Sequence, residues 1–177
     1  FIILIVWVTS LSVHAVELMT VHDLNVASPA GANGDSVAPW LSPDGRFVVF
    51  TSTASDLVTN DNAWLSLDVF LRDRVSNTTA LISENLQHTG GGNDHSTGVC
   101  VSTNGRYVLF ESVASDLVAD DTNSLTDVFV RDAQTMTTVL VSAMGAGGAG
   151  NNRSESAAMT PDGRYVAFVC YVTNLVA

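Results

Sequence analysis

The stretch Ser42-Pro-Asp-Gly-Arg-Phe-Val-Val-Phe50 decides the fold, because the chain carries it three times. It returns as Ser102-Thr-Asn-Gly-Arg-Tyr-Val-Leu-Phe110 and again as Thr160-Pro-Asp-Gly-Arg-Tyr-Val-Ala-Phe168. The copies start 60 and then 58 residues apart. A sequence that repeats itself at a fixed period folds into stacked structural units, so we predict one such unit for each copy.

The segments around this stretch recur with it and in the same order. Three segments of the first unit have copies in the second: Ala54-Ser-Asp-Leu-Val58 and Ala114-Ser-Asp-Leu-Val118, Asp68-Val-Phe-Leu-Arg-Asp73 and Asp127-Val-Phe-Val-Arg-Asp132, Thr78-Thr-Ala-Leu-Ile-Ser83 and Thr137-Thr-Val-Leu-Val-Ser142. Four matched segments in one order indicate that the whole unit of about 60 residues is repeated.

Each segment has the composition of a β-strand. Residues 46–52 and 106–112 are rich in β-branched and aromatic side chains, and a Pro-Asp-Gly or Thr-Asn-Gly turn leads into them. Proline fixes φ in such a turn, Asp or Asn caps nearby amides, and glycine takes the positive φ. Four strands joined as a meander predict an all-β fold, a β-propeller of four-stranded antiparallel blades. A β-solenoid or a β-sandwich is the alternative, although a sandwich requires no fixed period.

The repeat also predicts how the chain is divided. Residues 36–95 are expected to form the first blade, residues 96–153 the second, and residues 154–177 the first half of a third. Residues 16–35 hold a fourth-strand remnant, Val16–His22, and a linker. Propellers close with about 4 to 8 blades. Two complete blades and parts of two others make an incomplete propeller, so the remaining blades of the same protein are expected partners.

The amino terminus has the pattern of an export signal. Residues 1–8 form an unbroken apolar run, and residues 9–15 are smaller and more polar. Val13 and Ala15 suit the −3 and −1 positions of a cleavage site after Ala15. A spanning helix needs about 20 apolar residues, which favours a cleaved signal over a membrane anchor. Residues 1–15 are therefore predicted to be a signal peptide without its charged n-region, and the mature protein to be periplasmic or extracellular.

The charge of the chain limits the classes of partner. The chain has 7 basic residues, all of them arginine, and 18 acidic ones, for a formal net charge of −11. Binding to nucleic acid requires a basic surface, so no nucleic-acid partner is expected. Anionic membrane surfaces are disfavoured for the same reason, and no stable membrane insertion is expected after signal cleavage.

The repeated pattern resembles a known family. Ser-x-Asp-Gly-Arg-aromatic-Val-x-Phe, followed by Ala-Ser-Asp-Leu-Val and Asp-Val-Phe-x-Arg-Asp, is similar to the PD40 or WD40-like (TolB-like) β-propeller repeats of bacteria. The resemblance covers nearly all of residues 33–177, and residues 102–105 depart from the signature while keeping its turn chemistry. It implies a propeller of about six or more blades in the cell envelope or outside the cell. It also implies a binding or scaffold role and carries over no catalytic residue.

The loop before each third strand is rich in oxygen ligands. Its members are Asp61, Asn62 and Asp68 in the first unit and Asp121, Asn123 and Asp127 in the second. Oxygens at alternate positions with a further carboxylate resemble the start of a Ca²⁺ loop, so a Ca²⁺-stabilised surface propeller is one hypothesis. The full Ca²⁺-loop spacing is absent, and side chains that cap their own loop amides explain the composition equally well. No other cofactor is indicated.

Recurring arginines have a structural interpretation. Arg46, Arg106 and Arg164 start the second strand of each unit, and Arg72 and Arg131 stand near the end of the third. A binding site for one ligand would not recur identically in every unit. We therefore expect these charges to staple strands within or between blades.

The residues that differ between units are the best candidates for binding. Trp64 has no aromatic counterpart in the second unit, and His88 and His95 of one inter-blade loop recur nowhere else. Packing of Trp64 on the blade edge, and solvated histidines, are the alternatives. Loops carry function on such scaffolds, which points to residues 59–67 and 85–95.

The sequence contains no sign of catalysis. No Gly-x-Ser-x-Gly elbow is present, and no acid–base pair can be assigned. The first hypothesis is therefore an exported, non-enzymatic β-propeller that binds a protein, peptide or glycan. The alternative is the propeller domain of a larger, peptidase-like hydrolase whose catalytic domain lies beyond residue 177.

Overall fold

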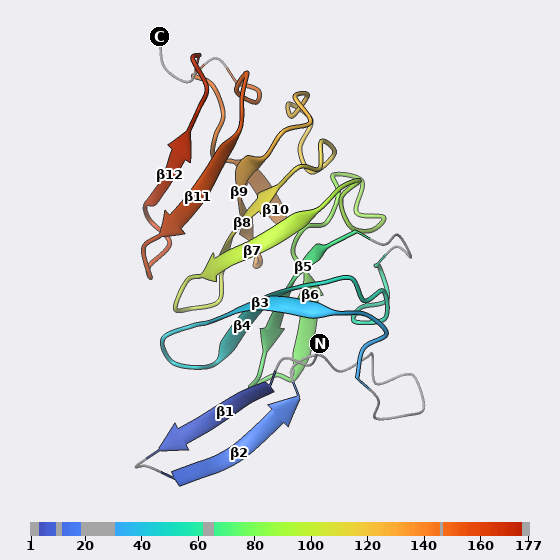
Figure 1. Ribbon diagram of the computed structural model, residues 1–177, viewed down its shortest axis with the longest axis vertical. Coiled ribbons are helices and arrows are strands. Elements are labelled where there is room, and N and C mark those ends of the chain that lie inside the picture. The colour runs from blue at the N-terminus through green and yellow to red at the C-terminus, as the bar shows by residue number, and fades with distance from the viewer. Residues whose placement is uncertain (1–3, 10–11, 19–30, 62–65, 146, 175–177) are drawn as a thin grey trace.

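The chain is all-β in the computed structural model, which describes residues 4–9, 12–18, 31–61, 66–145 and 147–174. Two four-stranded antiparallel sheets follow each other along the chain, and a two-stranded sheet comes after them. Figure 1 shows these three sheets stacked in sequence order along the long axis of the molecule. The predicted fold class, with four-stranded antiparallel blades, is confirmed.

Each blade is a meander of neighbouring strands. Blade 1 contains β3 (Ser36–Leu41), β4 (Phe47–Ser52), β5 (Asp68–Asp73) and β6 (Thr78–Leu81). Blade 2 contains β7 (Ser96–Val101), β8 (Tyr107–Ser112), β9 (Asp127–Asp132) and β10 (Thr137–Leu140). Half-blade 3 contains β11 (Ser154–Met159) and β12 (Val166–Cys170). Strands adjacent in sequence are paired in each sheet, as the repeated segments predict.

The amino-terminal segment forms a hairpin. β1 (Leu4–Thr9) pairs antiparallel with β2 (Ser12–Leu18) in a two-stranded sheet. The expected fourth-strand remnant, Val16–His22, thus pairs its first residues with β1, and residues 19–22 lie outside the described chain. A strand pairs with an edge that satisfies its backbone groups, and β1 supplies that edge. Within the described ranges no helix is long and apolar enough to cross a bilayer, and the signal peptide stays a prediction.

The turn between the first two strands is held by short-range hydrogen bonds. In blade 1, the Ser42 hydroxyl donates to Asp44 Oδ1 over 2.6 Å, and the Arg46 amide donates to the same oxygen over 3.1 Å. Gly45 completes the turn with a φ of 72°. The equivalent acceptors in the other units are Asn104 and Asp162. The Asp-Gly-Arg or Asn-Gly-Arg signature that identifies the repeat therefore serves to form this turn.

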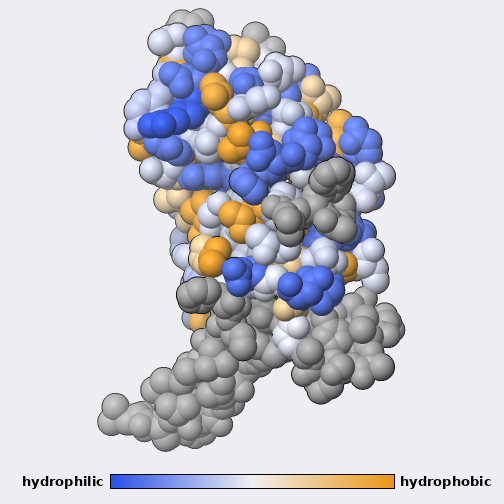
Figure 2. All heavy atoms as spheres, turned by 45° about the vertical axis from the view of Figure 1, so that its right-hand side comes forward, coloured by the Kyte–Doolittle hydropathy of each residue, from blue (hydrophilic) through white to orange (hydrophobic). Residues whose placement is uncertain are grey.

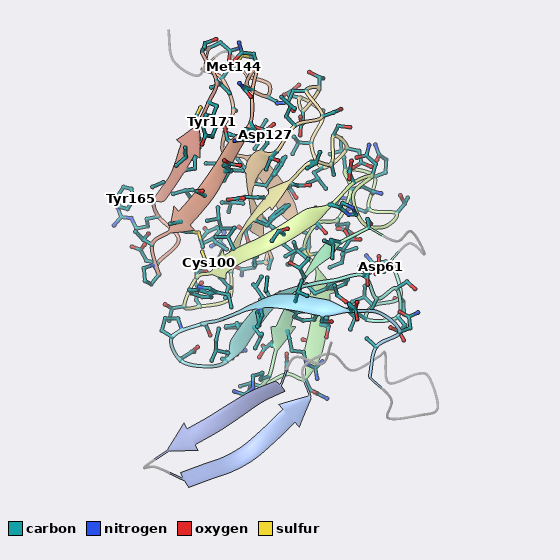
Figure 3. All side chains as sticks on the ribbon, viewed as in Figure 1. Asp61, Cys100, Asp127, Met144, Tyr165 and Tyr171 are labelled. Carbon is teal, nitrogen blue, oxygen red and sulfur yellow. The ribbon has the colours of Figure 1, made fainter. Side chains whose placement is uncertain are left out.

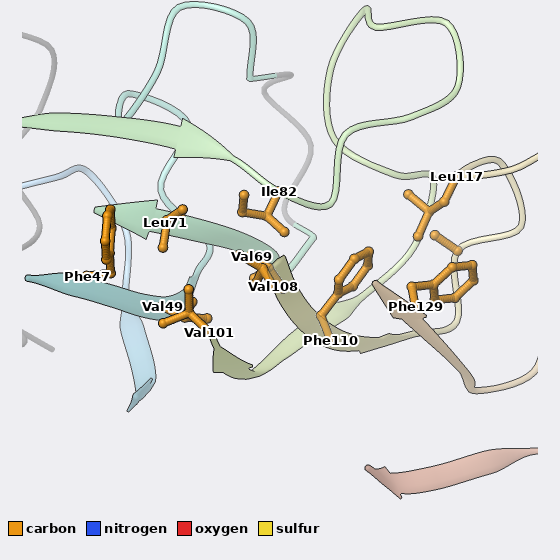
Figure 4. Close-up of a cluster of buried hydrophobic side chains, with 11 residues drawn as sticks. Phe47, Val49, Val69, Leu71, Ile82, Val101, Val108, Phe110, Leu117 and Phe129 are labelled. Carbon is orange, nitrogen blue, oxygen red and sulfur yellow. The ribbon is translucent and has the colours of Figure 1, made fainter. Parts of the chain in front are cut away.

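The largest core cluster lies between blades 1 and 2 (Figure 4). Blade 1 and the residue after it contribute Phe47, Val49, Val69, Leu71 and Ile82, and blade 2 contributes Val101, Val108, Phe110, Ala114, Leu117 and Phe129. Side chains alternate along a strand, so Val48 and Phe50 of β4 belong to a second cluster on the other face of blade 1. All six residues of β4 are buried as a result. Each blade therefore hides an apolar face against its neighbour.

A glycine in the first turn of a blade lets the neighbouring blade approach closely. A Cβ on Gly105 would lie 2.3 Å from Phe47 Cζ, and a Cβ on Gly163 would lie 2.5 Å from Tyr107 Cδ2. Phe47 and Tyr107 hold the same register in β4 and β8, opposite the last residue of the third strand. The same glycine–ring contact thus joins blade 1 to blade 2 and blade 2 to half-blade 3.

Replacing Gly105 with alanine is expected to destabilise the chain more than replacing Gly147. Both glycines have positive φ, 73° and 89°, so both alanine variants carry backbone strain. Only Gly105→Ala also pushes a methyl group into the Phe47 ring, because none of the described atoms lies within 4 Å of a Cβ at Gly147. We expect an extra loss of about 1–3 kcal/mol in the free energy of unfolding, measured by urea denaturation. Equal losses would contradict the glycine–ring contact.

Candidate functional site

The meander places short and long connections at opposite ends of each blade. The short turns, residues 42–46 and 74–77 in blade 1, lie at one end, which we call the turn end. The long connections, residues 53–67 and 82–95, lie at the other, which we call the loop end. In Figure 1 the turn end is on the left and the loop end on the right. The described residues among the predicted Ca²⁺ ligands and partner contacts belong to the loop end.

An asparagine fastens neighbouring connections at the loop end. Asn93 Oδ1 accepts the Ser115 amide over 2.9 Å, its Nδ2 donates to Ser115 Oγ over 3.1 Å, and its own amide donates to Asp116 over 2.9 Å. The same three bonds recur at Asn33 and Asn151. Sequence reasoning missed this role, although the asparagines recur at the spacing of the repeat.

The aspartate that starts the third strand is buried in both blades. Asp68 accepts the Ser83 hydroxyl over 2.7 Å, and Asp127 accepts the Ser142 hydroxyl over 2.6 Å. Burial raises the pKa of both aspartates, and the hydroxyl donors partly offset that rise. These two predicted Ca²⁺ ligands therefore tie the start of the third strand to a serine two residues after the end of the fourth.

The structure brings the three predicted ligands of blade 2 together. Asn123 Nδ2 donates to Asp127 Oδ2 over 2.7 Å and to the Gly150 carbonyl over 2.8 Å. Asp121 is buried, and that burial together with the charge of Asp127 raises the pKa of Asp121 to about 6. Across the described ranges, no three His, Cys, Asp or Glu side chains gather as a metal site. The Asn123 Oδ1 atom accepts the Leu125 amide over 2.7 Å, so this side chain presents its N–H groups, and not its oxygen, to Asp127 and the Gly150 carbonyl.

The equivalent loop of blade 1 is described only in part. Asn62 and Trp64 lie outside the described residues, so Trp64 as a partner contact stays a prediction. Asp61 is half-buried. The Ser66 hydroxyl donates to Asp68 Oδ2 over 3.0 Å, a role that Asn123 has in blade 2. The two loops therefore differ in how they satisfy the same buried aspartate.

His88 belongs to a charge network that joins the two blades. Glu84 Oε2 accepts Arg131 Nη2 over 2.5 Å and lies 2.8 Å from His88 Nδ1, and Asn60 Nδ2 donates to Glu84 Oε1 over 3.0 Å. The side chains of Arg131 and Glu84 are only 2% and 5% exposed, whereas that of His88 is 56% exposed. The predicted staple role of Arg131 is confirmed, and its partner lies in the other blade. Sequence reasoning missed Glu84, because Ala143 follows the matching serine in blade 2.

His95 has a different position from His88. Its Nδ1 accepts the Leu67 amide over 2.9 Å, so it holds the end of the first long connection. Leu86 stands two residues before His88 and is 47% exposed, and its amide donates to the Asp116 carbonyl over 2.8 Å. The connection thus presents Leu86 and His88 on a backbone fixed to blade 2. Leu86 was not singled out from the sequence, since exposed leucines carry no signal of their own.

The turn end carries the other recurring arginines. Arg46 pairs with Asp73 over 2.7 Å, and Arg106 pairs with Asp132 over 2.7 Å, in each case from the second strand to the third. These pairs confirm the predicted staples at Arg46 and Arg106. Arg72 donates to the Asn77 carbonyl and to Thr79 Oγ1 within blade 1, so it too links neighbouring strands. Arg164 lies over the Tyr165 ring and has no ion pair with the described residues, so its role as a staple stays a prediction. The hydrogen bonds from arginine hold the pKa of Asp73 well below its usual range and lower that of Asp132 to about 2. A cleft of about 600 Å³ lies between the blades at this end. Arg46 and Arg106 line it, and each is already paired with an aspartate.

Replacing Arg131 with methionine is expected to destabilise the chain by about 3–5 kcal/mol, because the variant leaves Glu84 buried without its cation. Urea denaturation measures the loss. Arg106→Met is the matched control, since its side chain is 38% exposed and water can solvate Asp132. The control is expected to lose much less stability, and Arg131→Met combined with Glu84→Gln is expected to recover part of the loss. Similar losses for the two single variants would argue against a buried inter-blade pair.

Comparison with known proteins bears on the fold. No protein-family model matches the sequence, and no curated protein matches it. Among solved structures, the crystal structure of TolB from Acinetobacter baumannii matches with a TM-score of 0.50 and 16% sequence identity. The match covers 90% of this chain and 30% of that one, so the chain spans less than a third of the length of that TolB. The chain therefore has the architecture of part of a TolB-like β-propeller.

Proposed function

We propose that this chain is part of an exported β-propeller that binds a protein, peptide or glycan through its loop end and performs no catalysis. One observation carries the proposal: the strands and turns of each unit repeat, whereas the sequences of the loop-end connections differ. The asparagine fasteners recur in all three units, but the residues they leave exposed do not. Scaffolds of this kind place function in variable loops.

The connection between blades 1 and 2 is the strongest candidate for a contact surface. It exposes Leu86 and His88, and Glu84 fixes His88 while also binding Arg131 of the next blade. The corresponding connection after blade 2 has no Leu or His in residues 143–153. An apolar side chain next to an imidazole on a fixed backbone suits contacts with a peptide, a protein loop or a sugar ring.

The charge of the loop end supports a neutral or basic partner. Asp56, Asp94, Asp116 and Asp120 are partly or fully exposed there, and the ion pairs of the described residues use none of them. Figure 2 shows a largely hydrophilic face, interrupted by single hydrophobic residues. Such a surface repels polyanions, which opposes nucleic acid and anionic membranes as partners.

Further blades of the same protein are the proposed partners of both end faces. Leu41 is 40% exposed, whereas Val101 at the same register in blade 2 is 1% exposed. Tyr165 is 66% exposed and points away from the stack in Figure 3, whereas Phe47 at the equivalent position in blade 1 is 7% exposed. Positions that interior blades bury are thus exposed at both ends. Apolar faces of this kind mark interaction sites.

Ligands selected from libraries are expected to depend on Leu86. The mature protein, recovered from the periplasm with Val16 as its expected first residue, would be screened against a phage-displayed peptide library and a glycan array. Leu86→Asp is expected to weaken the selected ligands about tenfold or more, because it places a charge in the contact surface. Val75→Asp, at a 74% exposed valine of the turn end, is the matched control and is expected to have no effect. Ligands sensitive only to Val75→Asp, or no ligand at all, would contradict the proposal.

The exposed end faces are expected to make the isolated chain self-associate. Sedimentation velocity would show association that increases with protein concentration, because a second copy can cover the Tyr165 face in place of a further blade. Tyr165→Asp is expected to reduce this association, and Val75→Asp is expected to leave it unchanged. If Tyr165→Asp associates as strongly as the unmodified chain, the Tyr165 face is not a blade-covering surface.

A further inference from the structure

The second unit departs from the repeat in the turn that faces blade 1. Asn104 occupies the position that aspartate holds in the other two turns, at Asp44 and Asp162. Asn104 Oδ1 accepts the Ser102 hydroxyl over 2.8 Å and the Arg106 amide over 3.1 Å, so it makes both of the bonds that an aspartate makes there. The turn itself therefore does not require an amide. What the amide adds is its Nδ2 group, which donates to none of the described residues.

Other unused donors line the same cleft between blades 1 and 2. Arg46 and Arg106 bind their aspartates through Nε and Nη2, and the Nη1 group of each donates to none of the described residues. The Gln134 side chain also lines the cleft and makes no hydrogen bond within the described part of the chain. Each oxygen of Asp73, by contrast, already accepts a hydrogen bond. The cleft thus offers more free donors than free acceptors, which suits a ligand rich in acceptor atoms.

The turn end also lacks the negative charge that the chain carries as a whole. The residues at or next to the short turns include as many arginines as aspartates: Arg46, Arg74, Arg106 and Arg164, with Asp44, Asp73, Asp132 and Asp162. An aspartate in place of the asparagine would add a negative charge to the cleft. The two cleft guanidinium groups stack on neighbouring rings, 4.7 Å and 4.9 Å from the ring centroids, while their aspartates hold them from the side. These donors are therefore fixed before a ligand binds, which lowers the entropy cost of binding.

We propose that this cleft binds the free carboxyl terminus of a peptide. Arg106, Asn104 and Gln134 supply donors from the wall that blade 2 forms, and Arg46 supplies one from the wall that blade 1 forms. A carboxylate accepts several hydrogen bonds at once, and those from arginine are strengthened by its charge. The site lies at the opposite end of the blades from Leu86, so it is independent of the partner binding proposed there.

The apolar part of the lining favours a peptide over an acidic sugar. Ala80 and Ala133 are half-buried and line the cleft together with the buried Leu71, which leaves small apolar surfaces for an aliphatic side chain. A sugar ring would instead require an open aromatic face. Phe47 is the aromatic residue of the lining, and it is only 7% exposed. A cleft of about 600 Å³ is within the usual size of pockets for small ligands, so it fits the last few residues of a chain.

NMR titration of the isotope-labelled mature protein with peptides tests the proposal. The probe is a mixture of N-acetylated tetrapeptides with a free carboxyl terminus, and the same mixture with an amidated terminus is its control. The free-acid mixture is expected to shift the side-chain amide resonances of Asn104 and Gln134, and the amidated mixture is expected to shift neither. Sodium glucuronate is expected to bind at least about tenfold more weakly than the free-acid peptides, because it lacks their apolar contacts. Equal shifts from the two mixtures, no shift from either, or equally tight binding of glucuronate would overturn the proposal.

Matched variants of the turns locate the bound carboxylate. Asn104→Asp restores the residue of the other two turns and is expected to weaken the free-acid peptides about tenfold or more, because a like charge replaces a donor. Gln134→Glu changes an exposed side chain of the same cleft and is expected to weaken them as well. Asp162→Asn makes the reverse change in a turn outside the cleft and is expected to leave the peptide affinity unchanged. Circular dichroism would establish that the variants are folded. Full affinity in both Asn104→Asp and Gln134→Glu, or a loss of affinity in Asp162→Asn, would overturn the assignment.

Discussion

The close contact between a turn glycine and the aromatic ring of the preceding blade controls the spacing of the stack. Phe47 fills the space that a side chain at Gly105 would occupy, and Tyr107 does the same at Gly163. At this separation the apolar faces of blades 1 and 2 exclude water and form one core. A wider gap would leave these faces under-packed, and the buried Arg131–Glu84 pair could not span it. The polar contacts described above therefore depend on the packing between blades.

Polar groups at the loop end are positioned by that packing. The buried aspartates that start β5 and β9 are tolerated because a serine after the fourth strand donates to each of them. Asn33, Asn93 and Asn151 then fix each connection to its neighbour by side-chain hydrogen bonds, where a β-sheet would use a regular series of backbone hydrogen bonds. Loops held at both ends in this way vary in sequence between their anchors without disturbing the sheets. This arrangement allows a repeated framework to carry a non-repeated surface.

Most of the fold was predictable from the sequence, and the site only in part. The Gly-Arg turns and the strands recur in register, so repetition identified them. Repetition also identified Arg46 and Arg106 as staples, and the structure supplied their partners. Asn123 and Asp127 were singled out because oxygen-bearing side chains recur in the loop before each third strand, and the structure joins the two by a hydrogen bond. Glu84 was missed because its charge pairs across 47 residues with the neighbouring blade, and such a pairing leaves no local pattern. Exposed Leu86 was missed because its position depends on a backbone bond to Asp116.

Departures from the repeat are therefore more informative about function than the repeat itself. Positions that pack in the same way keep the same contact in both blades, as the serine–aspartate pairs do. The second donor to each buried aspartate differs between the blades: Ser66 donates to Asp68, while Asn123 donates to Asp127. The serine solution satisfies its aspartate with hydroxyl donors. The asparagine solution also donates to the Gly150 carbonyl, so in the second loop the side chain that satisfies the buried aspartate joins it to the connection that leads into half-blade 3.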